Sequence, residues 1–309
     1  MSSTTARQPK RNVIGILLLD KPKGLTSNAA LQSVKRLFYA KKAGHTGSLD
    51  PLASGMLPIC FGKGTKFSRF LLEADKTYQV IMQLGVRTDT GDAEGKVIEE
   101  HIVPKLHQDQ ILDLFKNFLG AIEQIPSMYS AIKHQGKPLY TFARRGIEVD
   151  RPKRTVKIYQ LTLLNVEKDN VEFIVRCSKG TYVRTLVDDM GKALKTGAHV
   201  TALRRLNAGH FDEKQMVSLR ELKFAADQDS NSQLDKFLLP LDTIISCPES
   251  VYLTSAMAFC IKQGGAIKVT QSVSPGYVKL YLSNRVFLGV GKVLSDGSIV
   301  AEQLLNNLC

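Results

Sequence analysis

Two neighbouring runs of β-forming residues, at 155–166 and 171–177, constrain the fold more than any other feature of this sequence. Only residues 167–170 separate them, and a connection this short joins two antiparallel strands. In the second run every other residue from Val171 to Cys177 is apolar, so these side chains share one face. The pattern predicts a hairpin with one face on a hydrophobic core.

Other patterns before residue 200 add helices and further strands. Apolar residues recur at helical spacing after a cap at Ser27 or Asn28, and short β-rich runs stand between turns that contain Gly or Pro. The predicted strands lie at 13–19 and 78–86, and the predicted helices at 27–38, 108–119 and about 183–194. With the hairpin they predict an α+β fold, a mixed, largely antiparallel sheet with flanking helices.

Residues 247–309 have a different character. Short β-rich runs such as VKLYL and RVFLGVGKV are separated by Gly, Ser and Asn, which is typical of a small β-barrel. The chain is long enough for two domains, and we place their boundary near Cys247 and Pro248. The predicted organisation is a disordered tail at 1–11, a main domain at 12–246 and a small β domain at 247–309.

The formal net charge is +13 and the isoelectric point is about 9.5. Such a surplus attracts polyanions, nucleic acid above all, although a basic surface that only maintains solubility is an alternative. The densest basic stretch, at 127–157, also contains Tyr129, Tyr140 and Phe142, a mixture suited to gripping phosphates and stacking on bases. A solvated charged loop is the alternative there. The candidate contacts to an RNA backbone are Lys66, Lys133, Arg144, Arg145, Arg151, Lys153 and Arg154.

Several classes of protein are disfavoured by what the sequence lacks. No run approaches the roughly 20 apolar residues of a membrane span. Five widely spaced cysteines fit reduced thiols in the cytoplasm better than a disulfide framework. The six histidines form no HExxH motif or His/Cys cluster, so no metal is expected. Residues 62–66, GKGTK, lack the full spacing of a phosphate-binding loop. Side chains must then carry any chemistry without a cofactor.

The segment GHTGSLDPLASG at residues 44–55 concentrates turn-forming residues around one carboxylate, Asp50. A residue before proline is kept out of the helical region, so Asp50 is held extended or in a turn. Gly47 and Gly55 permit a sharp bend or a close approach of the backbone to a ligand. The dipeptide Asp-Pro alone favours a simpler interpretation, in which Asp50 only begins a turn.

This segment resembles the catalytic loop of the TruB family, the bacterial tRNA pseudouridine-55 synthases. Further segments are similar to that family and follow in the same order: LLLDKPKGLTS at 17–27, KFSRFLLEADKTYQV at 66–80, GVRTDTGDAEG at 85–95, QIPSMYSAIKHQGKPLY at 124–140 and CSKGTYVRTLVDDMG at 177–191. The resemblance implies the pseudouridine-synthase fold, followed by a small RNA-binding domain of the PUA type.

The resemblance also implies catalytic roles by motif position. Asp50 is then the single catalytic carboxylate, which attacks C1′ of the target uridine or takes the 2′ proton to assist departure of uracil. Arg184 pairs with Asp50, lowers its pKa by about 1 to 3 units and keeps it ionised. A cation in the first turn of a helix opposes the helix dipole, which also indicates an anion near Arg184. Tyr78 stacks on the target base and carries the proton from C5.

Other residues match family positions that hold the flipped base. His45 inserts into the RNA loop, while Tyr182 and Leu203 line the base pocket, although Leu203 is equally a candidate for the core. The basic stretch coincides with a thumb-like insertion over the RNA in this family, here at about 125–157. We interpret Asp89 and Asp92 as turn residues that accept hydrogen bonds from local backbone N–H groups.

The predicted function is conversion of uridine 55 in the T-loop of tRNA to pseudouridine by base flipping, cleavage of the N1–C1′ bond and joining of C5 to C1′. No cofactor or metal is expected. The expected partner is the T-arm of tRNA, bound by a cytoplasmic monomer with no membrane and no obligatory protein partner. Two alternatives stay open: an RNA chaperone that refolds tRNA without the chemistry, and a base-removing hydrolase, for which no second acid is assigned.

Overall fold

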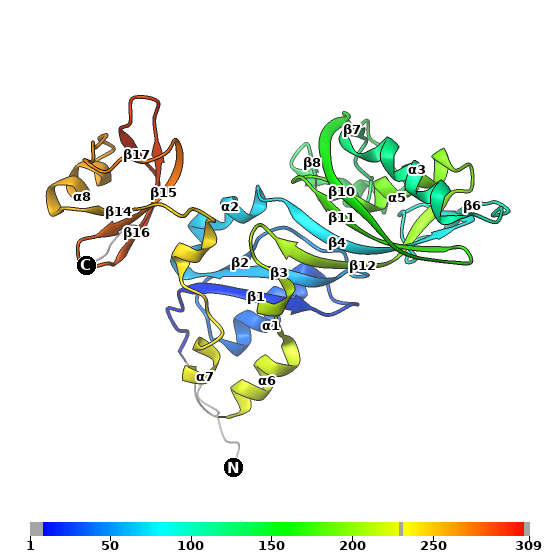
Figure 1. Ribbon diagram of the computed structural model, residues 1–309. Helices are drawn as coiled ribbons and strands as arrows, with labels where there is room; N and C mark the ends of the chain where they lie inside the picture. The colour runs from blue at the N-terminus through cyan, green and yellow to red at the C-terminus, as the bar shows by residue number, and fades with distance from the viewer. Residues whose placement is uncertain (1–8, 131, 229–230, 306–309) are drawn as a thin grey trace, which may run out of the picture.

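The computed structural model describes residues 9–130, 132–228 and 231–305. Over these residues the main sheet has nine strands in the order β13-β1-β3-β12-β4-β11-β10-β7, with β2 paired to β3 (Figure 1). Along the chain the strands are β1 (Gly15–Lys21), β2 (Ala43–His45), β3 (Ser54–Phe61), β4 (Lys76–Leu84), β7 (Gly120–Gln124), β10 (Arg154–Glu167), β11 (Asn170–Cys177), β12 (Ala198–Ala208) and β13 (Val217–Ser218).

The hairpin predicted at 155–177 is present. β10 pairs antiparallel with β11, from Ile158 opposite Cys177 to Glu167 opposite Asn170. The other neighbouring pairs of the sheet are also antiparallel, except β1 with β13 and β3 with β12, which are parallel. The predicted mixed, largely antiparallel sheet is confirmed.

Helices cover the sheet in two groups (Figure 1). Near one end lie α3 (Gln108–Phe118) and α5 (Val183–Ala193), and near the other lie α1 (Ser27–Leu37) and α6 (Leu219–Asp227). One apolar cluster includes buried side chains from all four helices and from the strands they cover. The shorter helices are η1 (Gly62–Phe67), α2 (Ser68–Leu72), α4 (Leu139–Ala143), η2 (Glu213–Gln215), α7 (Asn231–Asp235) and η3 (Leu241–Ile244). Within the described residues, we find no helix with both the length and the apolar character needed to span a bilayer.

The strand predicted at 78–86 is displaced and interrupted. β4 already begins at Lys76 and ends at Leu84. Gly85 follows with a φ of 90°, a conformation that glycine adopts readily, and turns the chain. The next residues form the short strand β5 (Val86–Thr88), which pairs with β6 (Val97–Glu100) outside the main sheet.

Residues 250–305 form a small β domain. Its four-stranded sheet, counted over the described residues, has the order β14 (Ser250–Leu253), β15 (Gly276–Leu282), β16 (Phe287–Val293) and β17 (Ile299–Leu304). The helix α8 (Ser255–Lys262) contacts β14 and β17. The boundary expected near Cys247 falls between η3 and β14.

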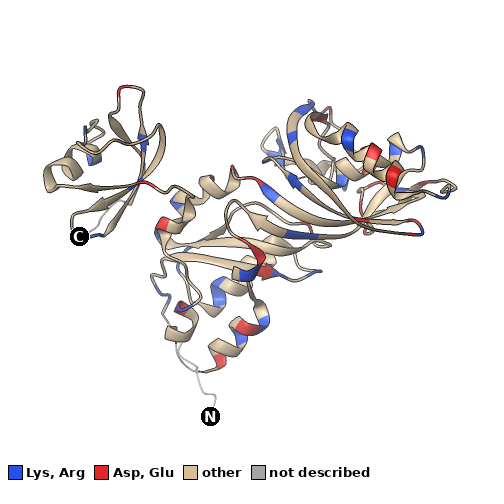
Figure 2. Ribbon diagram, in the orientation of Figure 1, with Lys and Arg blue, Asp and Glu red and all other residues tan. Residues whose placement is uncertain are grey.

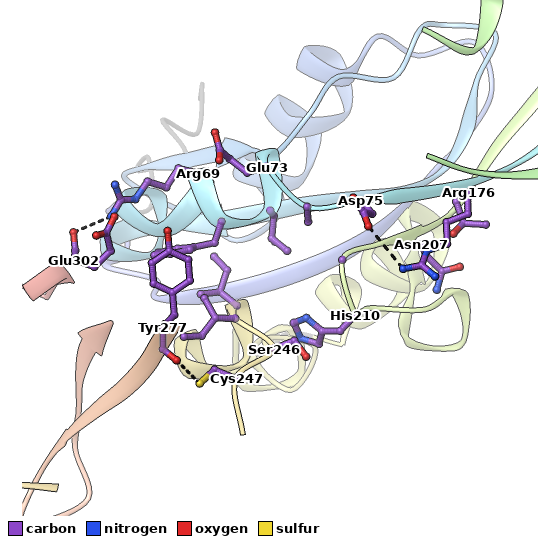
Figure 3. Close-up of a pocket in the computed structure, with 17 residues that line it drawn as sticks. Arg69, Glu73, Asp75, Arg176, Asn207, His210, Ser246, Cys247, Tyr277 and Glu302 are labelled. Atoms are coloured by element: carbon purple, nitrogen blue, oxygen red, sulfur yellow. Dashed lines mark hydrogen bonds and ion pairs between the residues drawn. The ribbon is translucent and has the colours of Figure 1, made fainter. Parts of the chain in front are cut away.

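The small β domain packs against the main domain. Val290 of β16 shares an apolar cluster with Ile16 of β1, and Arg69 pairs with Glu302 at 2.6 Å. A cavity of about 910 Å³ lies at this junction and is lined by residues of both parts (Figure 3). Asp50, Tyr78 and Arg184, which the sequence motifs single out, are not among its lining residues.

Residues 125–153, which we call the insertion, leave the main sheet and return to it at one point. Gln124 ends β7, Arg154 begins β10, and these two residues are direct partners across the strands. The insertion contains β8 (Lys133–His134), β9 (Lys137–Pro138) and α4. Lysines and arginines mark both the insertion and β10 beside it (Figure 2).

Candidate active site

The segment 44–55 forms the end of β2, a loop and the start of β3. Gly47 and Gly55 have φ angles of 90° and 95°. A Cβ atom on Gly55 would lie 2.3 Å from the carbonyl oxygen of Arg205 in β12, so no side chain fits there. The two glycines therefore serve the predicted sharp bend, and the close approach at Gly55 is to β12 and not to a ligand.

Ser27 fixes this loop immediately before Asp50. The buried Ser27 hydroxyl donates to the carbonyl oxygen of Leu49 at 2.8 Å and accepts from the N–H of Leu49 at 2.7 Å. The cap of α1 is Thr26, whose hydroxyl accepts from the N–H of Ala29 at 3.1 Å. The predicted cap one or two residues later is wrong because the loop uses the Ser27 hydroxyl.

Arg184 lies in the first turn of α5 and faces Asp50. Its Nε is 2.9 Å from Oδ2 of Asp50. The other guanidinium nitrogens donate to the carbonyl oxygens of Thr90 at 2.8 Å and Tyr129 at 2.9 Å. The Arg184 side chain is only 7% exposed, while that of Asp50 is 40% exposed. The predicted pair is present, with a fixed guanidinium and a carboxylate that a ligand can reach.

A second carboxylate also contacts Arg184. Oδ2 of Asp92 lies 3.3 Å from Nη1 of Arg184, and the Asp92 side chain is 4% exposed. Its Oδ1 accepts from the Thr90 hydroxyl at 2.6 Å and from the N–H of Glu94 at 3.1 Å. The interpretation of Asp92 as a turn residue that accepts from local N–H groups is right for Oδ1. That interpretation missed the ion pair of Oδ2 with Arg184.

The pKa of Asp50 lies above its ordinary value. Burial outweighs the lowering by Arg184, which is present as predicted, so the predicted net lowering of this pKa is wrong. Burial among protein atoms is the largest cause; Arg184 acts against the rise, Asp92 adds to it and Lys21 opposes it. Burial also lowers the pKa of Lys21 to about 8, and the Asp50 charge opposes that fall. The Lys21 side chain is fully buried and donates to two main-chain carbonyls at 2.9 and 2.7 Å. Arg184 therefore orients Asp50, and it offsets only part of the burial.

Tyr78 lies half-buried on β4, at the centre of the sheet. Its direct partners are Val175 on β11 and Arg205 on β12. Burial raises the pKa of the Tyr78 hydroxyl, Arg205 opposes that rise, and the charge of Asp50 adds to it. Tyr78 therefore lies within electrostatic reach of Asp50 and beside a buried cation.

Tyr182 precedes α5, and the root of the insertion holds its main chain. The buried amide of Gln124 accepts from the N–H of Tyr182 at 3.1 Å and donates to its carbonyl oxygen at 3.3 Å. Tyr129 lies early in the insertion. Its carbonyl oxygen accepts a hydrogen bond from Arg184, and its hydroxyl donates to Asp89 at 3.1 Å. The insertion is thus hydrogen-bonded to Arg184, and Gln124, the residue immediately before it, is hydrogen-bonded to Tyr182.

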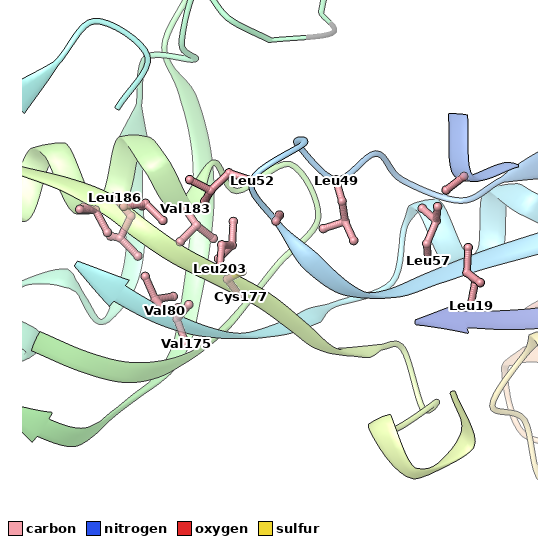
Figure 4. Packing of buried hydrophobic residues seen from close by; sticks show 14 of the residues in the cluster. Leu19, Leu49, Leu52, Leu57, Val80, Val175, Cys177, Val183, Leu186 and Leu203 are labelled. Carbon is pink, nitrogen blue, oxygen red and sulfur yellow. The ribbon is translucent and has the colours of Figure 1, made fainter. Parts of the chain in front are cut away.

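His45 and Leu203 have different surroundings. His45 ends β2 and is half-buried, and its buried Nδ1 has no hydrogen-bond partner among the described residues. Burial and, to a smaller extent, Arg205 lower the pKa of His45, so its imidazole is neutral at pH 7. Leu203 is 8% exposed and shares the main apolar cluster with Val183 and Cys177 (Figure 4). Of the two roles foreseen for Leu203, its burial supports that of a core residue.

The candidate contacts to the RNA backbone are mostly on the surface. The exposed ones are Lys66, Lys133, Arg144, Arg145, Lys153 and Arg154. Arg151 is half-buried and donates to two main-chain carbonyls at 3.1 and 3.0 Å, so it braces the insertion from inside. Arg144 lies 5.5 Å from the ring centre of Tyr140. Arg154 lies opposite Gln124 across β10 and β7, and Gln124 is hydrogen-bonded to the main chain of Tyr182.

The structure gathers Asp50, Arg184, Tyr78 and Tyr182 into one site. Arg184 pairs with Asp50 and lies two residues after Tyr182. Tyr78 is the strand partner of Arg205, which donates to the carbonyl oxygen of Gly47 in the loop of Asp50. Sequence reasoning missed the burial of Lys21, Gln124 and Arg205 around it, and the ion pair of Asp92 with Arg184. The available signal was a polar residue at the end of an apolar run, as in GILLLDK. No cluster of three or more His, Cys, Asp and Glu in the described part of the chain is arranged to hold a metal ion.

Three family models match consecutive parts of the chain. Residues 35–183 match "TruB family pseudouridylate synthase (N terminal domain)", which includes Asp50 and Tyr78. Residues 184–246 match "tRNA pseudouridylate synthase B C-terminal domain". Residues 250–305 match "Pseudouridine synthase II TruB, C-terminal".

Solved structures share the fold. A chain in the structure of an H/ACA RNP bound to a substrate RNA containing 2′-deoxyuridine has a TM-score of 0.71 and 24% identity, over 95% of this chain and 86% of that one. A chain of a Cbf5-Nop10-Gar1 complex has a TM-score of 0.71 and 25% identity, over 94% and 84%. The predicted pseudouridine-synthase fold is confirmed by this likeness.

Proteins named tRNA pseudouridine synthase B are similar over nearly the whole chain. The one from Coxiella burnetii (strain RSA 493 / Nine Mile phase I) is 53% identical over 296 residues, 96% of each chain. The one from Nitrosococcus oceani is 49% identical over 295 residues, again 96% of each. The one from Yersinia pestis (strain Pestoides F) is 48% identical over 97% of this chain and 94% of its own. This chain belongs to the TruB family of pseudouridylate synthases.

Proposed function

We propose that this chain converts uridine 55 in the T-loop of tRNA to pseudouridine. The observation that carries the proposal is the Asp50–Arg184 pair, an accessible carboxylate held at 2.9 Å by a buried guanidinium. The substrate class follows from the family, since relatives 48–53% identical are named tRNA pseudouridine synthase B. The reaction is an isomerisation in which the N1–C1′ bond breaks, a C5–C1′ bond forms, and one proton leaves C5 as one joins N1.

We assign to Asp50 the reaction at the ribose of the target uridine. Its carboxylate either attacks C1′ or takes the 2′ proton, and both routes need the anion. The raised pKa of Asp50 makes that anion more basic, which favours either route once the proton is lost. Arg184 keeps the carboxylate aimed while Ser27 holds the residue before it. The base leaves its stack to reach this site, at a cost of a few kcal/mol.

The surrounding side chains are assigned to the flipped base. Tyr78 stacks on uracil and carries the proton, and Tyr182 lines the same pocket, where stacking on an aromatic ring contributes about 1 to 3 kcal/mol per base. Leu203 supplies an apolar wall from the core. His45, neutral at pH 7, enters the RNA loop at the place that the base leaves.

The insertion is the proposed RNA clamp. Its exposed cations can neutralise phosphates, and the hydrogen bond from Arg184 to its Tyr129 carbonyl connects the clamp with the catalytic centre. We further propose that residues 247–309 form an RNA-binding domain of the PUA type. The protein acts in the cytoplasm as a monomer and needs no protein partner.

Incubation of the purified protein with an unmodified tRNA transcript tests this function. Pseudouridine mapped at position 55 is the expected result, and a transcript with cytidine at that position is the control. The absence of product contradicts the proposal. Release of free uracil would identify a hydrolase instead, and refolding of misfolded tRNA without any product would identify a chaperone.

Binding of tRNA is expected to weaken steeply with salt. If the insertion and its neighbours neutralise about six to eight phosphates, the slope of log K against log salt is about −5 to −7. Replacing Lys133, Arg144 and Arg145 by Ala should make that slope shallower by about 2 to 3. Lys116→Ala on α3, where Lys116 pairs with Asp113, is the matched control and should leave the slope unchanged. Filter binding at several salt concentrations measures it, and a nearly flat dependence contradicts the clamp.

A further inference from the structure

Arg205 is among the largest fully buried side chains of the described residues, with 1% of its surface exposed. Its neighbour Arg204 faces the other side of β12 and pairs with Asp20 through two contacts of 2.9 Å. None of the ion pairs formed by the described residues includes Arg205. A buried cation without a carboxylate is costly unless other groups replace its lost hydration.

The contacts of Arg205 reach both ends of the loop that carries Asp50. Its Nη2 donates to the carbonyl oxygen of Gly47 at 3.1 Å, before Asp50. Its Nε donates to the carbonyl oxygen of Met56 at 2.6 Å, after Asp50. The main chain of Arg205 also pairs with that of Gly55, at the close approach that excludes a side chain. One residue of β12 therefore ties the two ends of the loop together.

The same guanidinium lies beside Tyr78. Arg205 and Tyr78 are direct partners on the antiparallel strands β12 and β4, so their side chains leave the same face of the sheet about 4.5 to 5.5 Å apart at Cβ. The charge of Arg205 acts on the Tyr78 hydroxyl and favours its ionised form. Arg205 thus contacts the loop of Asp50 and adjoins the oxygen of Tyr78.

We propose that Arg205 is a positioning residue that fixes the Asp50 loop at both ends and stabilises negative charge on the Tyr78 oxygen during the isomerisation. The inference rests on the proposed function. Uracil leaves C1′ with the electron pair of the N1–C1′ bond, and Tyr78 donates its proton to N1. After C5 has joined C1′, the C5 proton passes to the Tyr78 oxygen, so the tyrosine ends as it began. Between the two transfers that oxygen is negative, and Arg205 is the adjacent cation.

Arg205→Lys and Arg205→Met separate the two parts of the role. The lysine keeps a charge but cannot reach both ends of the loop, so we expect pseudouridine formation in a single turnover to slow by about 10- to 100-fold with tRNA affinity little changed. The methionine also removes the charge, so release of tritium from C5 of labelled uridine should slow further. Tyr78 must begin the cycle protonated, so the rate should fall as the pH rises through the Tyr78 pKa. That fall should move to higher pH in Arg205→Met, because the cation that lowers the Tyr78 pKa is gone.

Two comparisons separate this role from a merely structural one. Arg204→Met, on the opposite face, should keep the wild-type rate. If Arg205 acts through Tyr78, the further loss from Arg205→Lys to Arg205→Met should disappear once Tyr78 is replaced by Phe, because both variants have already lost the loop contacts. Additive losses, or an unchanged pH profile in Arg205→Met, would overturn the role at Tyr78.

A folded Arg205→Lys protein with the wild-type rate would overturn the role at the loop. If Arg205→Met does not fold, the rate of Arg205→Lys alone tests the proposal. Melting temperatures of all variants show which of them fold. The wild-type protein keeps the two proposals apart. If it makes no pseudouridine, the proposed function fails. If it does, and the Arg205 variants match it, only the role of Arg205 fails.

Discussion

Asp50→Asn is expected to abolish pseudouridine formation, with a fall of at least about 10⁴-fold in the single-turnover rate. The amide has the size of the carboxylate, and its oxygen can still accept from Arg184, but it neither attacks C1′ nor takes a proton. Binding of tRNA should persist, because the exposed cations of the insertion are untouched. Mapping of pseudouridine and filter binding on the same preparation measure the two properties.

The control for this variant is Asp113→Asn, which removes a carboxylate from the surface of α3, where it pairs only with exposed Lys116. Its rate should equal that of the wild type. Formation of pseudouridine by Asp50→Asn would contradict a catalytic role for Asp50. A loss of tRNA binding together with activity would mean that Asp50 shapes the loop instead.

Arg184→Met is expected to lower both activity and stability. The loss of a buried ion-pair partner lowers the free energy of unfolding by about 3 to 5 kcal/mol, since Asp92 remains buried without its cation. The rate should fall by about 10²- to 10³-fold. Arg184 opposes the rise in the pKa of Asp50, so its removal raises that pKa further, and the rate deficit should shrink as the pH increases.

The stability deficit of Arg184→Met should change with pH in the opposite direction to its rate deficit, and should shrink as the pH falls. A carboxyl with a raised pKa in the folded protein favours folding most when it is protonated, below its ordinary pKa of 3.8. That contribution is lost as the pH rises through the folded pKa. The stability deficit of the variant is therefore largest at neutral pH and narrows on acidification toward 3.8. Urea unfolding over a pH series measures it. Arg204→Met, which breaks the more exposed pair with Asp20, is the control, and a deficit independent of pH would contradict the account.

Local pattern and family resemblance predicted much of this molecule. The hairpin at 155–177 follows from alternation and a short turn, and both are properties of adjacent residues. The loop of Asp50 and its pairing with Arg184 followed from motifs that lie far apart in the chain. The rise in the pKa of Asp50 was missed because it depends on burial among groups from several elements.

The two adjacent arginines of β12 show the limit of sequence reasoning. Arg204 and Arg205 are identical adjacent residues, yet one lies in a partly exposed pair with Asp20 and the other is buried beside Tyr78. Strand alternation predicts that they face opposite sides, but only the tertiary arrangement decides which side is the catalytic one. Gln124 presents the same difficulty, because its amide matches the main chain of Tyr182, a residue remote in sequence.

The paired ends of the insertion bear on how proteins of this kind can diversify. Gln124 and Arg154 are partners across β7 and β10. The pairing of these two strands therefore does not depend on the length of the chain between them. Evolution can then lengthen, shorten or exchange that chain without moving a strand of the sheet. Recognition of different RNA shapes can change in this one segment while the reaction chemistry is inherited intact, provided that a main-chain carbonyl still accepts from Arg184 as that of Tyr129 does.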